Sequence, residues 1–385
     1  MRILYVFHSL AVWGGIERVL VDKMNHLAKM YDDEVFMLTT DQGNHSVPYQ
    51  LEPKVHLEDL GICFHHQYRH RGVKRWMMAH RLSCLYEKLL SERIQVINPD
   101  VIVCTTSNYQ DINLLVRLKK DIPLVVESHS ICRATLGQKG LKNRFTDYMY
   151  QWGLTKAQVI VALTEEDAAD WRSIHPCVRV IPNIVHLNDG NVSSYDHKRV
   201  IFVGRLDYQK RPMEMIEIWR MVYPKFPDWH LDIYGEGQQL QELEDVVHSL
   251  DMHIHIHQPT EHIFEAYRNS SILVSTSSFE PFGLVIPEAM SCGLPVVAYD
   301  CPFGPQTIIN DGDNGFLVEN NDRRAFADRL CLLMSNLSLC KKIGQVASLS
   351  VQQYSAEVIM PKWRELFSGF IVFLIVLRFV SMLIV

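Results

Sequence analysis

Two glutamates eight positions apart are the residues in this sequence best suited to hold a polar ligand. Glu280 lies in a loop after the apolar run 272–274, and Glu288 lies on a short helix expected to begin at Gly283 and Leu284. Backbone N–H groups at a helix N-terminus attract anions. An anion flanked by two carboxylates that accept hydrogen bonds from hydroxyls fits a sugar diphosphate, so we expect such a ligand at this loop.

Two basic residues, Arg205 and Lys210, could neutralise a diphosphate. Arg205 follows the predicted strand 199–203, and Lys210 lies five residues later in the next loop. A guanidinium binds phosphate oxygens in pairs, whereas an ammonium binds them as a compact charge. Either residue alone could serve in a surface salt bridge, but their shared context with the Glu280 loop favours a leaving-group site. The G-x-x-x-x-G-K-[ST] pattern of P-loop phosphate sites is absent. No G-x-G-x-x-G follows the first strand, which argues against a dinucleotide site.

The first half of the chain offers a glycine pair and one histidine. Gly14 and Gly15 stand between the strand 2–8 and an amphipathic helix, where a phosphate could meet backbone or where a tight turn is simply needed. His129 ends the predicted strand 124–129. Ligands of open α/β sheets collect at such strand ends, so His129 is either functional or a satisfied structural histidine.

Three histidines at alternate positions, His253, His255 and His257, would face one side of a strand. They could bind a metal ion. No carboxylate or cysteine nearby in the sequence completes a ligand set, so a half-exposed strand is the favoured interpretation and we predict no metal site.

The composition predicts a globular protein of two domains. The 385 residues exceed what one core usually supports, and 48% are apolar while 21% are charged. A net charge of -6 argues against a nucleic-acid partner. The nine cysteines include no C-x-x-C pair, which indicates reduced thiols in a cytosolic compartment rather than a disulfide framework.

Apolar runs alternate with helical patterns along the chain, which predicts an α/β protein with parallel sheets. A polar run that begins at Pro182 and ends at Lys198 is the candidate linker between two such sheets. The expected strands are 2–8, 34–39, 96–104, 124–129, 158–162 and 178–181 before the linker, and 199–203, 229–234, 253–257, 272–274, 295–299 and 315–318 after it.

Two segments favour contact with a membrane. Residues 65–81 form the most basic stretch, with aromatic and methionine side chains interleaved, although a solvated helix face would look similar. Residues 366–385 are apolar except for Ser368, Arg378 and Ser381. A helix of this length just reaches across a bilayer core of about 30 Å. Whether it spans the membrane, lies in it or packs on the protein body stays open.

The motifs together resemble family 4 glycosyltransferases of the GT-B fold. The E-x7-E arrangement of Glu280 and Glu288 is similar to the signature of that family, which retains anomeric configuration. Further matching motifs are Gly14-Gly15-Ile16-Glu17, Pro182-Asn183, Gly204-Arg205 with Lys210, Gly235-Glu236-Gly237 and Asp311-Gly312-Asp313-Asn314-Gly315. The resemblance implies two Rossmann-like domains facing across a cleft. We expect an N-terminal acceptor-side domain at 1–183, a linker at 184–198, a nucleotide-sugar domain at 199–360, and a helix with an apolar tail at 361–385.

The resemblance also implies roles for individual residues. Glu280 would hold hydroxyls of the donor sugar, and Glu288 the ribose hydroxyls. Arg205 and Lys210 would bind the diphosphate, and His129 would lie near the reacting carbon. Gly14, Gly15, Phe282, Gly283 and Leu284 would complete the substrate-binding set.

The reaction implied is transfer of a hexose or N-acetylhexosamine from a nucleotide sugar without an enzyme nucleophile, a metal or another cofactor. The segment Cys301-Pro302-Phe303-Gly304-Pro305 is similar to members that use UDP-sugars to extend lipid-diphosphate-linked glycans. The implied partners are therefore a nucleotide-sugar donor and a glycan or polyprenyl-diphosphate-linked acceptor. The implied location is the cytoplasm, peripheral or tail-anchored at the inner face of the membrane.

Two other functions remain as alternatives. A nucleotide-sugar epimerase or hydrolase of the same fold would need no acceptor. A non-catalytic scaffold that binds nucleotide sugars at a membrane should have lost one of Glu280, Arg205 or Lys210, and all three are present.

Overall fold

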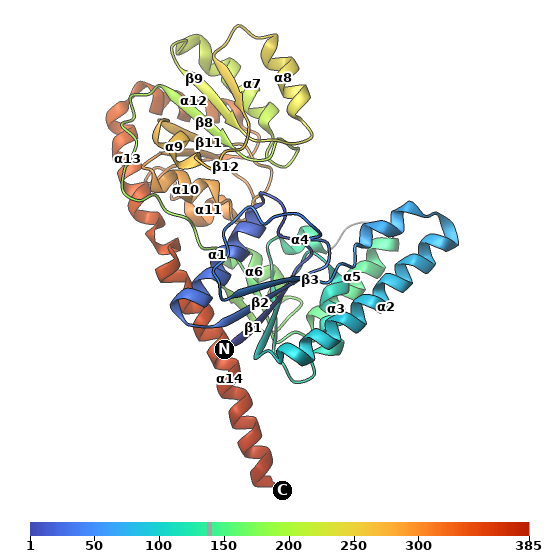
Figure 1. Ribbon diagram of the computed structural model, residues 1–385. Coiled ribbons are helices and arrows are strands. Elements are labelled where there is room, and N and C mark those ends of the chain that lie inside the picture. Colours follow the sequence, from blue (N-terminus) through green and yellow to red (C-terminus); the bar gives the residue numbers. More distant parts are fainter. Residues whose placement is uncertain (137–140, 385) are drawn as a thin grey trace. The chain divides into compact units, whose positions relative to one another are not determined.

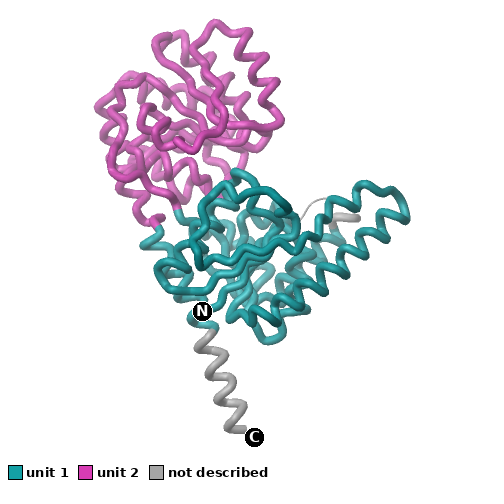
Figure 2. The backbone as a smooth tube through the Cα atoms, in the orientation of Figure 1, with its two compact units in different colours: residues 1–184, 356–385 teal, residues 185–355 magenta. Residues whose placement is uncertain are grey.

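The chain folds into two compact units (Figure 2). The computed structural model describes residues 1–136 and 141–384, with side chains described for all of these except 141–143 and 371–384. Unit 1 contains Met1–Ile184 and Ala356–Val385, and unit 2 contains Val185–Ser355. Each unit has one parallel β-sheet packed against helices (Figure 1). This arrangement confirms the predicted fold class.

The sheet of unit 1 has seven strands in the order β3-β2-β1-β4-β5-β6-β7. Most of its strands are continuous apolar runs, as expected where both faces of a parallel sheet are covered. The chain order reverses between β1 and β4, and ligands of open α/β sheets bind at such a reversal. The strands are β1 (Arg2–Val6), β2 (Glu34–Thr39), β3 (Val55–Asp59), β4 (Val101–Thr105), β5 (Leu124–Glu127), β6 (Val159–Ala162) and β7 (Val178–Val180).

Helices cover both faces of this sheet. One apolar cluster lies beneath α2, α3, α5 and α6, and a second lies beneath α1 and the first part of α14. Side-chain caps start two of the helices, with Asn108 before α3 and Thr164 before α6. The helices are α1 (Gly15–Met30), the 3₁₀ helix η1 (Phe64–Arg69), α2 (Gly72–Ile97), α3 (Tyr109–Leu118), α4 (Cys132–Thr135), α5 (Leu141–Leu154), α6 (Glu165–Arg172) and α14 (Ala356–Ile384).

The sheet of unit 2 has six strands in the order β10-β9-β8-β11-β12-β13. Its chain order reverses between β8 and β11, so the loops after these two strands begin side by side. The strands are β8 (Arg199–Val203), β9 (His230–Tyr234), β10 (Ile254–His257), β11 (Ile272–Ser275), β12 (Val296–Asp300) and β13 (Phe316–Glu319).

A large apolar cluster of unit 2 lies between its strands and the helices α7, α8, α12 and α13. Pro212 opens α7, where its missing N–H costs nothing, and Asp322 and Asn336 cap α12 and α13. The helices are α7 (Pro212–Val222), η2 (Tyr223–Lys225), α8 (Leu240–His248), α9 (Ile263–Arg268), α10 (Val285–Ser291), α11 (Gly304–Ile308), α12 (Arg323–Ser335), α13 (Leu337–Ser350) and η3 (Val351–Tyr354).

The structure departs from the sequence expectations at the start of one strand, in the linker and at the C-terminal segment, and it adds the unexpected strand β3. The expected strand 96–104 begins too early, because Val96 still belongs to α2 and β4 starts only at Val101. The expected linker at 184–198 is largely part of unit 2, which begins at Val185. Tyr195 within it is buried in the core of unit 2, and its carbonyl accepts a hydrogen bond from Ser271. The second domain was expected to end at residue 360, with 361–385 as a further segment. The chain instead joins unit 1 again at Ala356.

The first part of α14 is held in unit 1 by apolar packing and an ion pair. Ile359, Trp363 and Phe367 are buried against the sheet, and Arg364 binds both carboxylate oxygens of the buried Asp33 at 2.7 and 2.8 Å. In the part of the chain that the structure describes, no helix is long and apolar enough to cross a membrane. The expected apolar tail falls largely on 371–385, whose side chains lie outside the described residues.

Candidate active site

A buried ion pair joins two of the predicted site residues in unit 2. Lys210 Nζ contacts Glu280 Oε1, and Ser277 Oγ donates a hydrogen bond of 2.7 Å to the same oxygen. The Glu280 side chain is only 4% exposed and the Lys210 side chain 15%. Lys210 follows β8 and Glu280 follows β11, the two strands at the reversal point of the sheet. The fold thus brings together a cation and an acceptor seventy residues apart.

Backbone contacts hold the two loops in register with each other. Ser278 N–H donates to Gln209 O at 2.8 Å, and Gln209 Nε2 donates to Phe279 O at 3.1 Å. Thr276 Oγ1 donates to the carbonyl oxygens of Lys210 and Arg211 at 3.1 and 2.9 Å. The spacing of Lys210 and Glu280 is therefore fixed by hydrogen bonds to main-chain carbonyls as well as by their mutual attraction.

Glycines next to these loops allow backbones to approach closely. A Cβ on Gly304 would lie 2.3 Å from Phe282 O, and the Gly304 N–H donates to Glu280 O at 2.7 Å. A Cβ on Gly235 would lie 1.9 Å from Gly204 O. Larger residues at either position would displace the loops that carry the candidate site.

Arg205 differs from Lys210 in its surroundings. Its side chain is 66% exposed and contacts Asp207 Oδ2 at 3.3 Å and Gln209 Oε1 at 2.8 Å. An exposed guanidinium on a long side chain can turn toward an incoming anion. The prediction that Arg205 binds a diphosphate rests on this freedom.

The loop of Glu280 continues into helix α10. Gly283 has φ +84°, a conformation that favours glycine, and Phe282 is buried against the ring of Tyr354. Among the described residues no protein acceptor is recorded for the N–H groups of Gly283 and Leu284. These two donors precede a helix of seven residues, as the sequence predicted.

Glu288 lies inside α10 with 4% of its surface exposed. The Tyr267 hydroxyl lies 3.4 Å from its Oε2 and donates to it. A side chain of helix α9 thus holds this carboxylate, which lies eight positions after Glu280.

In unit 1 the glycine pair occupies the start of α1. Gly14 is the N-cap, Gly15 is the first helical residue, and the Gly14 carbonyl accepts a hydrogen bond from Tyr49 Oη at 3.2 Å. The Glu17 carboxylate folds back so closely that a Cβ on Gly14 would meet it at 1.9 Å. A negative group already stands at this helix N-terminus, where it stabilises the helix dipole. A phosphate at Gly15 would have to displace it.

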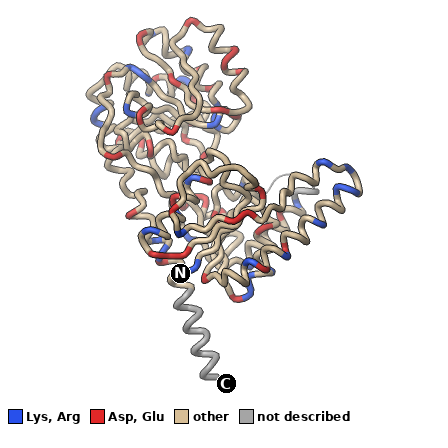
Figure 3. Tube along the Cα trace, in the orientation of Figure 1, with Lys and Arg blue, Asp and Glu red and all other residues tan. Residues whose placement is uncertain are grey.

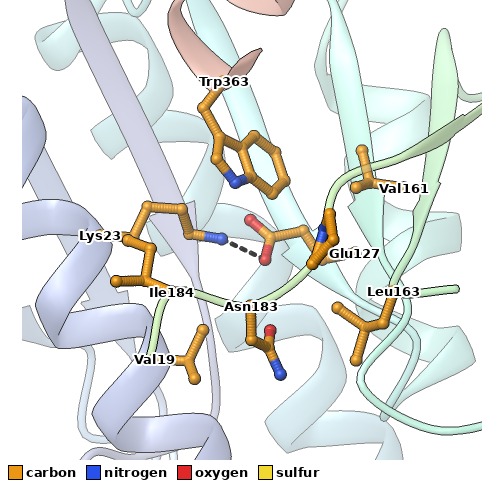
Figure 4. A pocket seen from close by; sticks show the side chains of 9 residues that line it. Val19, Lys23, Glu127, Val161, Leu163, Asn183, Ile184 and Trp363 are labelled. Atoms are coloured by element: carbon orange, nitrogen blue, oxygen red, sulfur yellow. Dashed lines mark hydrogen bonds and ion pairs between the residues drawn. The ribbon is translucent and has the colours of Figure 1, made fainter. Parts of the chain in front are cut away.

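His129 lies just beyond β5 and is held by a carboxylate of that strand. Its Nε2 is 3.0 Å from Glu127 Oε2, and the same oxygen contacts Lys23 Nζ from α1. The Lys23 ammonium lies 4.0 Å from the centroid of the Trp363 ring on α14. Lys23, Glu127 and Trp363 line a small pocket together with Asn183 and apolar side chains (Figure 4).

Burial and charge act against each other in this group. Burial lowers the pKa of the Lys23 ammonium from its usual value, although Glu127 favours its charged form. Burial also opposes ionisation of Glu127, but Lys23 and His129 together hold the pKa of that carboxyl below its usual value. Glu127 Oε1 has no hydrogen-bond partner among the described residues. Lys23 and Glu127 thus form a charged pair in apolar surroundings, and the Glu127 carboxylate also bonds the ring of His129.

The sequence interpretation missed Glu127 and Lys23. A glutamate within the apolar strand 124–127 was the available signal, because an unpaired buried carboxylate is costly and implies a partner. Its partner lies 104 positions away, so only the fold identifies Lys23.

The three histidines of the β10 segment have a neighbour that the sequence did not reveal. His257 Nε2 is 2.9 Å from Asp232 on the adjacent strand β9, and His255 is 3.0 Å from His230. β10 is the edge strand of the sheet, as expected for the half-exposed interpretation.

Comparisons with known proteins agree with this architecture. Residues 13–189 match a family model described as Glycosyltransferase Family 4, and residues 189–349 match a model described as Glycosyl transferases group 1. An uncharacterized glycosyltransferase of Haemophilus influenzae is 25% identical over 91% of this chain and 95% of its own length. Two further relatives, each 32% identical, are matched over only 21% and 62% of their lengths.

One relative and one solved structure cover nearly the whole chain. The Campylobacter jejuni enzyme named GalNAc-alpha-(1->4)-GalNAc-alpha-(1->3)-diNAcBac-PP-undecaprenol alpha-1,4-N-acetyl-D-galactosaminyltransferase is 24% identical over 95% of this chain and 98% of its own. The S. aureus TarM G117R mutant in complex with Fondaparinux, alpha-GlcNAc-glycerol and UDP has a TM-score of 0.78 at 17% identity, covering 95% of this chain and 99% of that one. At this identity the second similarity establishes the fold.

Proposed function

The chain is a glycosyltransferase of the GT-B fold, and we propose that it moves a hexose or N-acetylhexosamine from a UDP-sugar to a glycan or lipid-linked glycan, with retention of anomeric configuration. The buried Lys210–Glu280 pair at the reversal point of the second sheet carries this proposal. The matched structure that contains UDP and the Campylobacter relative named for a PP-undecaprenol-linked acceptor support the donor and acceptor classes.

On the donor side, Lys210 and Arg205 bind the diphosphate and the N–H groups of Gly283 and Leu284 add neutral donors. Lys210 exchanges its contact with Glu280 for phosphate oxygens when the donor binds. Glu280 is then released to accept hydrogen bonds from sugar hydroxyls, because an ionised carboxylate can only accept. Glu288 receives the ribose hydroxyls, and Gly14, Gly15 and Phe282 complete the site.

In the reaction, the bond from the anomeric carbon to the diphosphate oxygen breaks and a bond to an acceptor hydroxyl oxygen forms. The nucleoside diphosphate leaves with the bonding electron pair, and the acceptor proton goes to a phosphate oxygen. Positive charge from Lys210 and Arg205 stabilises the leaving group, so neither a metal nor another cofactor is required. His129, oriented by Glu127, contacts the donor sugar near this carbon.

The acceptor side lies in unit 1, where α2 carries a basic and aromatic surface. Helix α3 contacts both α2 and α5, and Lys and Arg gather at the free end of this helical arm (Figure 3). Large apolar side chains stand exposed beside these charges, namely Tyr68, Val73, Trp76, Met77, Phe145 and Tyr148. Cations with exposed aromatic rings suit anionic lipid headgroups. We therefore place the protein on the cytoplasmic face of a membrane, with the apolar tail as a second contact.

A thermal-shift screen of the purified chain against UDP, GDP and ADP tests the donor site. A ligand that binds only the folded state adds about 2.7 kcal/mol of stability at a hundredfold excess over its dissociation constant. We expect UDP alone to raise Tm, and Lys210→Ala to lose most of that rise. Lys225→Ala, which alters an exposed lysine of the same unit, should respond to UDP like wild type. Absence of a shift with every nucleotide would contradict the proposal.

A further inference from the structure

We propose that Cys63, His65 and His66 form a binding site for a divalent metal ion, with Zn²⁺ as the ion of best fit. One ligand atom from each of the three residues lies within 4.8 Å of the other two. A thiolate with two imidazoles is a typical zinc donor set, and it selects against Mg²⁺ and Ca²⁺, which prefer oxygen ligands. The site lies in unit 1 and is separate from the residues assigned to sugar transfer.

The local backbone brings the three side chains together before any ion arrives. Cys63 is the N-cap of the 3₁₀ helix η1, and its carbonyl accepts a hydrogen bond of 2.9 Å from His66 N–H. Residues i and i+3 eclipse each other in a 3₁₀ helix, so Cys63 and His66 stand on the same side. Three ligands on four consecutive residues need little rearrangement to converge.

Cys63 is also held in an unusual conformation. Its φ is +54°, a left-handed value that is unfavourable for a residue other than glycine. A hydrogen bond of 3.0 Å from Cys63 N–H to Thr40 O keeps the residue there, next to the loop after β2. The fold thus maintains a strained geometry at the position that would supply the thiolate.

Asp41 in that same loop supplies a partner for the histidines. Its Oδ1 lies 3.1 Å from His65 Nδ1. A carboxylate that holds one ring nitrogen leaves the other for the metal, and this second contact commonly fixes metal-bound histidines.

The position of the site gives the ion a mechanical role. The loop after β2 and the segment after β3 both leave the carboxyl edge of the sheet, and η1 leads directly into α2. An ion bound by Cys63, His65 and His66 would fix the turn from which α2 and its basic, aromatic surface begin.

Metal titration of the full chain, first stripped with a chelator, tests the site. We expect one Zn²⁺ per chain by calorimetry, and with Co²⁺ a thiolate charge-transfer absorption in the near ultraviolet. Cys63→Ser should abolish that absorption and weaken Zn²⁺ binding. His66→Ala should weaken Zn²⁺ binding at least as much as Cys63→Ser does. Asp41→Asn should weaken Zn²⁺ binding about 10- to 100-fold.

A second cysteine–histidine pair provides the matched control. Cys84 Sγ and His80 Nε2 lie 3.7 Å apart on the exposed surface of α2. Cys84→Ser should leave both the Zn²⁺ affinity and the Co²⁺ spectrum unchanged, and metal-free Tm should be the same for all variants. Absence of a stoichiometric ion, or a Co²⁺ thiolate spectrum that survives Cys63→Ser, would overturn the proposal.

Discussion

Two lysine–glutamate pairs dominate the chemistry of this protein at the scale of single residues, and they are built for different purposes. Lys210 and Glu280 are partly open to solvent on the lysine side, so an anion can compete for the ammonium. Lys23 and Glu127 are enclosed, at 2% and 3% side-chain exposure, and Glu127 also bonds His129. The first pair suits binding, and the second suits the positioning of His129.

The enclosed pair predicts a large effect of Lys23→Met. Removing one partner of a buried pair typically costs about 3–5 kcal/mol, because the remaining charge is uncompensated. In this variant burial raises the pKa of Glu127 above its unfolded value, so the folded chain binds the extra proton. The contribution of Glu127 to stability should then be fully present at low pH and should be lost as pH rises through the raised pKa.

Chemical denaturation of Lys23→Met across pH measures this effect. The double variant Lys23→Met/Glu127→Gln, which removes both charges, should recover much of the loss and should lack the added pH dependence. A Lys23→Met variant as stable as wild type at neutral pH would contradict the proposed role of the pair.

Candidate site residues were predictable from the sequence where they lie in short motifs. The loop of Glu280, the helix of Glu288 and the position of Lys210 follow from local glycine, proline and carboxylate patterns. The contact between Lys210 and Glu280 was not predictable in the same way, because it depends on strand order. The role of Lys23 was not predictable either, since a lysine within an amphipathic helix normally faces solvent.

At the scale of elements, the site depends on how closely loops can pack. The loop of Glu280 is paired with residues 302–304, and the isolated bridge joins Glu280 to Phe303. Phe303 has φ +84°, and Gly304 follows it with no room for a side chain. The sequence predicted most strands of both sheets but not β3, whose residues VHLED contain only two apolar side chains.

Gly304→Ala should therefore damage the donor site through the backbone. The new Cβ would meet Phe282 O at 2.3 Å, and relief requires a shift of the loop that carries Glu280. We expect a loss of about 1–3 kcal/mol in unfolding free energy and weaker UDP binding in the same variant. Denaturant titration and nucleotide titration measure the two effects.

Gly369→Ala is the matched control for this substitution. Gly369 lies in α14 with nothing within 4 Å of an added Cβ, so alanine there should be neutral or slightly stabilising. Unchanged stability and UDP affinity in Gly304→Ala would show that the Glu280 loop does not depend on this close approach.

At the scale of the whole molecule, the chain builds two sheets and then returns to the first. Trp363 and Arg364 of α14 pack in unit 1 although unit 2 lies between them and Ile184 in sequence. The sequence predicted two sheets and a linker at 184–198, because strand patterns restart after the polar run, whereas Val185 already belongs to unit 2 in the structure. It did not predict that the C-terminal helix packs in unit 1, because the apolar face of a helix does not indicate which surface it covers.

We propose that this protein transfers a sugar from a UDP donor with the help of Glu280. The most direct measurement is acceptor-dependent release of UDP from labelled UDP-sugars by the full chain, supplied with membrane lipid-linked glycans. We expect sugar label to move to the lipid fraction, and Glu280→Gln to slow the transfer by about 10²–10³-fold, as for loss of one stabilising group in a site. Glu261→Gln, at an exposed glutamate of the same unit, should be as active as wild type. Label that stays on the nucleotide with every donor, or a Glu280→Gln variant with full activity, would contradict the account.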